Sequence, residues 1–188
     1  MAGSFSVEQI CSKALGLLGE KPITDLDQTT NPNAVRCAQL YAVTRDALLS
    51  EYAWGFATRR VMLEMDATVP AFGFSYQFVL PADKLRVQKA HDKSIKYVLE
   101  GDRLLTDASE VGIVYTRRIE EPGYFDALFT DCLSARMARE LAMPILKKLS
   151  AVQVAEGLYK DLISSAKRVD AMQDYDEPES ESSWLSAR

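Results

Sequence analysis

The residues of this chain that could do chemistry are one histidine, three cysteines and 27 carboxylates. His91 lies in the polar stretch KAHDKS, and the sequence offers none of the partners that a Ser–His–Asp triad or a zinc site requires. Cys11, Cys37 and Cys132 lie far apart, each within an apolar helical pattern and without metal-ligand spacing. We therefore expect His91 to be a solvated surface residue and the cysteines to be small buried side chains.

Carboxylates are the one residue type abundant enough to suggest a reaction. Glycoside hydrolysis needs only two of them at a suitable separation. Eight acidic residues are candidates: Asp25, Asp27, Asp46, Glu51, Glu64, Asp66, Glu120 and Glu121. Because this abundance has little specificity, hydrolysis of bacterial cell-wall glycan is kept only as an alternative function.

Other catalytic patterns are missing from the sequence. It contains no phosphate-binding GxxxxGK[ST], no GxGxxG and no HExxH. The run ARMARELA places Arg136, Arg139 and Glu140 on a helix edge, which we expect to face solvent or another subunit. We therefore expect no enzymatic activity, no cofactor and no metal ligand.

Composition limits the classes of partner. The chain has 188 residues and a net charge of −5, which argues against a nucleic-acid-binding regulator, because such domains are usually basic. Its apolar runs are shorter than the roughly 20 residues that span a bilayer, and the start MAGSFSVEQIC does not resemble a signal peptide. We expect the protein to be made in the cytoplasm and to have no contact with a membrane.

Helical periodicity occurs in two pairs of segments, one pair near each end of the chain. Ser6 and Gln9 form a capping box, Gly19 suits a left-handed helix end, and Asn31 followed by Pro32 marks a second start. Pro144 is expected to end the third helix. The predicted helices span residues 6–19, 32–53, 123–143 and 150–172.

Period-two alternation of β-branched and aromatic residues fills the region between these pairs, at about residues 59–118. The run EGDR between two alternating stretches predicts a hairpin turn. We therefore predict an α+β fold that is mainly α: an antiparallel bundle of about four helices, interrupted by a small antiparallel β subdomain.

The stretch WGFATRR lies where the second helix meets the first strand. We interpret Trp54 and Phe56 as an aromatic wedge that seals this joint, since such side chains carry large apolar areas. Arg59 and Arg60 begin the strand, where at most one can point toward the core. We expect these arginines to pair with acidic residues or to meet a neighbouring subunit.

Several runs, taken in order, resemble the head-to-tail adaptor proteins of tailed bacteriophages, called tail tubular protein A in short-tailed phages. The most specific are RDALL at 45–49, WGFA at 54–57 and LPAD at 80–83. The resemblance continues through EGDRLLTD, VGIVYTRRIEEPGYFDALF and LSARMARELAMPI and covers the chain up to about Asp170. It implies a helical fold that carries a small β subdomain.

The resemblance also implies a structural role in the virion. Family members form a dodecameric ring between the portal protein and the tail tube or nozzle, so that DNA passes through without specific binding. They pass a C-terminal segment along the portal. Some short-tailed relatives have been credited with peptidoglycan hydrolysis, and a tail-associated hydrolase is the alternative here.

Residues 1–172 would then be the adaptor domain, and residues 173–188 the portal-docking tail. This tail is acidic and Ser-rich, a composition that cannot bury enough apolar surface to fold alone, and we expect it to be flexible. The predicted portal-binding residues are Tyr175, Trp184, Leu185 and Arg188.

Overall fold

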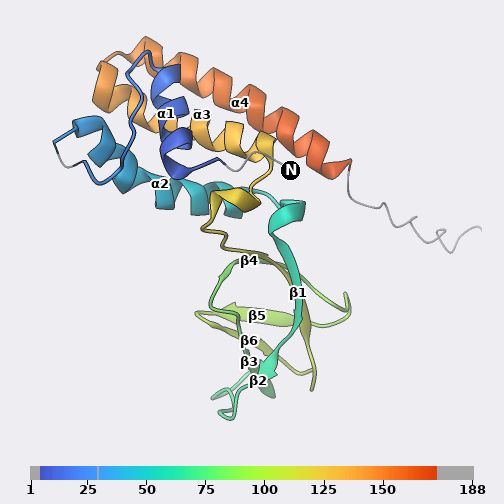
Figure 1. Cartoon of the computed structure of the whole chain (residues 1–188). Coiled ribbons are helices and arrows are strands. Elements are labelled where there is room, and N and C mark those ends of the chain that lie inside the picture. The colour runs from blue at the N-terminus through green and yellow to red at the C-terminus, as the bar shows by residue number, and fades with distance from the viewer. Residues whose placement is uncertain (1–4, 29, 173–188) are drawn as a thin grey trace, which may run out of the picture.

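The computed structural model describes residues 5–28 and 30–172, and it combines helices with antiparallel sheets, as the sequence predicts (Figure 1). Helix exceeds strand, at 48% against 19%. The α-helices of this described part are α1 (Val7–Leu17), α2 (Pro32–Glu51), α3 (Ala127–Leu146) and α4 (Leu149–Ala171). Figure 1 shows the helices gathered at one end of the molecule and the strands at the other. We call these ends the helical part and the β part.

Both termini of α1 have the caps that the local sequence predicts. At the start of α1, the Ser6 hydroxyl accepts from the Gln9 amide while the Gln9 side chain accepts from the Ser6 amide. At its end, Gly19 has φ +78, and the amides of Gly19 and Glu20 donate to the carbonyls of Gly16 and Leu15. This is the Schellman arrangement, which satisfies carbonyls that the helix leaves free.

The third helix differs from its prediction at both ends. A 3-10 turn, η2 (Pro122–Tyr124), comes first, and Asp126 is the N-cap of α3. The expectation that Pro144 ends the helix is wrong, because α3 continues to Leu146 and stops where Lys147 takes a left-handed φ of 52. Proline at position 144 removes one amide donor, but only two residues of α3 follow it, so the disruption is confined to the last turn.

The β part consists of two antiparallel sheets, where the sequence predicted one. Sheet A has the order β1-β7-β4, and sheet B has the order β2-β3-β6-β5. The strands are β1 (Thr58–Met62), β2 (Glu64–Met65), β3 (Tyr76–Val79), β4 (Lys84–Ala90), β5 (Tyr97–Glu100), β6 (Arg103–Thr106) and β7 (Gly112–Arg117). The alternating run from Val61 to Met65 crosses between sheets at Leu63, since β1 pairs with β7 and β2 pairs with β3. The predicted EGDR hairpin joins β5 to β6, with Gly101 at φ +59.

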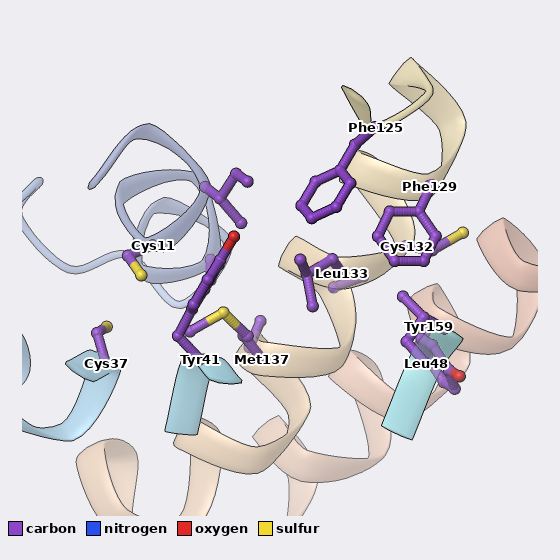
Figure 2. Packing of buried hydrophobic residues seen from close by; sticks show 14 of the residues in the cluster. Cys11, Cys37, Tyr41, Leu48, Phe125, Phe129, Cys132, Leu133, Met137 and Tyr159 are labelled. Atoms are coloured by element: carbon purple, nitrogen blue, oxygen red, sulfur yellow. The ribbon is translucent and has the colours of Figure 1, made fainter. Parts of the chain in front are cut away.

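Each part has its own hydrophobic core. In the helical part, Phe125, Phe129, Leu133 and Met137 follow one another at a spacing of four, so they share one face of α3 and its entry (Figure 2). This face packs against α1 and α2, and α4 packs along α3. The second core lies within the β part and contains Phe78, Leu80, Leu104, Val111, Ile113 and Tyr115. The residues between these two cores therefore fix how the parts are oriented.

Candidate functional site

Trp54 is the aromatic centre of the joint between the parts. It is only 1% exposed, and its indole Nε1 donates to the Leu48 carbonyl at 3.0 Å. Leu48 lies in the last turn of α2, where carbonyls lack the amides of a following turn. The indole also meets the rings of Tyr52 and Phe129 edge to face, both at 5.2 Å. Trp54 thus caps α2 and attaches its end to α3.

Phe56 extends the same aromatic contact to the start of the sheet. It lies in a 3-10 turn, η1 (Gly55–Ala57), and its ring is 5.1 Å from that of Phe129 and 6.3 Å from that of Phe125. The amide of Gly55 donates to the carboxylate of buried Asp170 near the end of α4, at 3.2 Å. The chain therefore enters β1 while held by both α3 and α4.

An ion pair crosses the joint, and further polar contacts lie next to it within the β part. Asp46 of α2 accepts from Arg45 and, across the joint, from Arg118, each at 2.8 Å. The backbone amide of Arg118 donates to the Asp83 carbonyl, and Tyr115 donates its hydroxyl proton to the Asp83 carboxylate at 3.0 Å. Asp46 and Asp83 therefore both contact Arg118, which links the helical part to the β part.

The two arginines of the joint have separate surroundings. Arg59 is exposed, and its Nη1 lies 3.9 Å from Asp83 Oδ2, a long ion pair of the expected kind. Arg60 instead lines a hollow of about 480 Å³ on sheet A, together with Lys89, His91 and Lys93. His91 is exposed, as predicted, and its Nδ1 accepts a hydrogen bond from the Gly112 amide at 2.9 Å.

A polar cluster at the edge of the helical core joins α2, α3 and α4, and no local sequence pattern predicts it. Glu51 accepts from Arg136 at 2.7 Å, from Tyr159 at 2.8 Å and from Lys167 at 3.0 Å. The expectation that Arg136 faces solvent is wrong, because its side chain is only 16% exposed and lies against the Tyr159 ring. The cluster needs residues from three helices, so no local spacing could reveal it.

The charges of this cluster settle the protonation of its members. Desolvation disfavours the charged form of Glu51, but hydrogen bonds from Lys167 and Tyr159 and the nearby cations outweigh it, so the pKa of Glu51 is lowered. Burial, aided by the hydrogen bond to Glu51, raises the pKa of Tyr159 to about 12. An ionised acid and a neutral phenol suit a permanent tie between helices, whereas a general acid requires a raised carboxyl pKa.

The cysteines occupy the core, as predicted. All three are buried and free, and Figure 2 shows Cys11 and Cys37 on neighbouring helices. A hydrogen bond between these two thiols and their burial raise the pKa of Cys11, and burial raises the pKa of Cys132 to about 12. Within residues 5–28 and 30–172, no three His, Cys, Asp or Glu side chains gather as a metal site would require.

The predicted portal-binding residues Tyr175, Trp184, Leu185 and Arg188 lie outside the described residues. Among the helices that are described, none has both the length and the apolar character needed to cross a bilayer. The chain matches no model of a known protein family and no curated protein with which it was compared.

Proposed function

We propose that this chain is a structural head-to-tail adaptor of a tailed bacteriophage. Copies of it form a ring, a dodecamer by the family resemblance, between the portal protein and the tail tube or nozzle. The ring extends the DNA channel without gripping the DNA, and the protein belongs to the neck of the virion. The four helices act as an antiparallel bundle that carries the β part as an insertion.

One observation supports this proposal above the others. The three segments that carry the resemblance lie at or next to the joint: Trp54 fixes the end of α2, Asp46 pairs with Arg118 across the joint, and Asp83 holds Tyr115 on the β side. Arg45, for example, is 6% exposed and is engaged by Asp46 and by the Tyr41 ring. Residues that fix the relative position of two parts determine the shape of the subunit, and a ring requires the same subunit shape in every copy.

The C-terminal segment supplies the contact with the portal in this proposal. Trp184 and Leu185 are its apolar anchors, since Trp is enriched among residues that dominate binding energy. Ordering of a polar segment on its partner limits the affinity of one copy, but repetition around a ring multiplies the effect. Portal contact thereby orders the tail and nucleates the ring.

Imaging tests this proposal directly. The purified chain is mixed with its portal and viewed by negative stain, and a second ring coaxial with the portal is expected. A chain that stops at Met172 should keep its circular dichroism spectrum and lose the ring. The double variant Trp184→Ala/Leu185→Ala should behave like the truncation, whereas Ser182→Ala/Ser183→Ala is the matched control and should still assemble.

Two results would overturn the proposal. Unimpaired portal binding by the truncated chain would remove the role of the tail. Clearing of peptidoglycan in a zymogram by the purified protein, lost in a single Asp or Glu variant, would replace the adaptor with the hydrolase alternative.

A further inference from the structure

The hollow on sheet A has a cationic rim and an apolar floor. Arg60 of β1, Val114 of β7 and Lys89 of β4 are paired across the sheet, so their side chains share one face. Two residues further from the helices, Gly112 lies between Met62 and His91. Position 112 has no room for a side chain: a Cβ there would lie 2.6 Å from Met62 Sδ and 3.4 Å from His91 Cβ.

Each polar side chain around the hollow can donate a hydrogen bond to a ligand. His91 Nδ1 accepts from the Gly112 amide, so in neutral His91 the ring proton is on Nε2. Arg60, Lys89 and Lys93 add three cations, and none of the residues that line the hollow is acidic. The neighbouring Asp92 is held by the Ser94 amide at 2.8 Å. A ligand for this surface would therefore be anionic and would carry an apolar group for the floor.

The chain itself contains a segment of this chemistry. Residues 173–188 carry five carboxylates and one arginine, with Tyr175, Trp184 and Leu185 as apolar side chains. The β part is the opposite, because residues 58–118 carry ten Lys and Arg against eight Asp and Glu. The two regions are complementary even though the whole chain is acidic.

The segment also starts in the right place. Asp170 accepts from the Gly55 amide, so the end of α4 is attached just before β1 begins (Figure 1). From Gly55 to Arg60 the chain advances five residues, which is at most about 17 Å at the strand rise of about 3.3 Å per residue, because the turn η1 is more compact than a strand. Sixteen residues extend to about 50 Å, so the carboxylates can reach the hollow within one chain.

We propose that, in the free protein, the acidic segment 173–188 docks on the hollow formed by Arg60, Met62, Lys89, His91 and Gly112 of its own chain. Carboxylates meet the cationic rim, and an aromatic side chain of the segment covers Val114 and Met62. Docking keeps Trp184 and Leu185 from contacting other proteins until a stronger partner takes the segment. The inference concerns the free chain, and its test needs no portal, so it can fail without affecting the proposed function.

Paramagnetic relaxation in the full-length chain tests the docking. A nitroxide is attached at Ser186→Cys, which the reagent can select because the native thiols are buried. The amide signals of Met62, His91, Lys93 and Gly112 should broaden in the labelled chain. The signals should stay sharp when nitroxide-labelled chain at natural isotope abundance is mixed with ¹⁵N-labelled chain that carries no nitroxide, because the contact is intramolecular.

Charge reversal and salt give the controls. Lys89→Glu/Lys93→Glu should abolish the broadening, whereas Lys21→Glu, an exposed lysine of the helical part, should leave it unchanged. Should the double variant fail to fold, raising the salt from about 0.1 M to about 1 M serves instead, since it shortens the Debye length from about 10 Å to about 3 Å. The broadening is then expected to disappear.

Three outcomes would overturn the proposal. The first is broadening located away from the hollow, or insensitive to both charge reversal and salt. The second is broadening that also occurs in the mixed sample, which would assign the contact to another copy. The third is the absence of tail broadening while an added thymidine oligonucleotide shifts the His91 and Gly112 amides, which would make the hollow a nucleic-acid contact.

Discussion

Replacing Trp54 tests whether the joint is held as described. Trp54→Phe keeps an aromatic ring against Phe129 and removes the indole N–H that donates to the Leu48 carbonyl. Trp54→Ala removes both contributions. Because the site is only 1% exposed, solvent cannot compensate for either loss without rearrangement of the joint.

The expected magnitudes follow from these contacts. Leaving the buried carbonyl of Leu48 without its donor costs about 1–3 kcal/mol, and the void left by the smaller ring costs about 1 kcal/mol more. Trp54→Phe should therefore destabilise the protein by about 2–4 kcal/mol. Truncation to alanine costs about 3–5 kcal/mol for the lost packing alone, so Trp54→Ala should lose more than Trp54→Phe.

Urea unfolding followed by far-UV circular dichroism measures these differences. For a chain of this size, each kcal/mol lost from the free energy of unfolding lowers Tm by about 2–4 °C. The Tm of Trp54→Phe should therefore lie roughly 5–15 °C below that of the parent protein. Phe72→Leu is the control, since Phe72 is 88% exposed and its replacement should change stability by less than about 0.5 kcal/mol. If Trp54→Phe matched this control, Trp54 would not be the anchor of the joint.

The other predictions concern ionisation and access. Glu51→Gln should lower the free energy of unfolding by about 1 kcal/mol near neutral pH, a figure limited by solvent screening. Because the pKa of Glu51 is lowered in the folded state, this stabilisation is present above the ordinary carboxyl pKa of about 4.3. The difference between the urea midpoints of the two proteins should vanish as pH falls through the lowered pKa. Burial raises the pKa values of Tyr159 and Tyr41 to about 12. The stability that their neutral form contributes is complete below the ordinary tyrosine pKa of about 10 and should be lost as pH rises toward 12. An ultraviolet titration should show these two residues ionising after the exposed tyrosines. A thiol reagent should leave the native protein unmodified and modify all three cysteines in denaturant, and rapid reaction of the native protein would contradict their burial.

Local features of this fold could be predicted from the sequence because their causes are local. The capping box at Ser6, the left-handed Gly19 and the turn at Gly101 each depend on residues within one or two turns of chain. The crossing at Leu63 could not be predicted, because the alternation from Val61 to Met65 is continuous and only distant partners decide which sheet each half joins. A strand pattern fixes which side chains share a face, but not the neighbour with which the strand pairs.

The same distinction applies to the candidate sites. Trp54 was identifiable because a large aromatic residue at the boundary between two periodicities has few roles other than packing. The cluster around Glu51 depends on side chains that are 85, 108 and 116 residues away in sequence. The hollow on sheet A is lined by residues of three strands and a turn, which only the strand pairing brings together.

The polar contacts at the joint matter more for geometry than for free energy. Arg118 is 42% exposed and Asp46 is 24% exposed, so their ion pair is screened, and pairs of this kind contribute about 0–1 kcal/mol. Two separate cores can each be stable without it. What the pair fixes, together with the Asp83 contacts, is the direction in which the β part leaves the helices. A closed ring needs that direction to be the same in every copy, since any deviation accumulates around the ring.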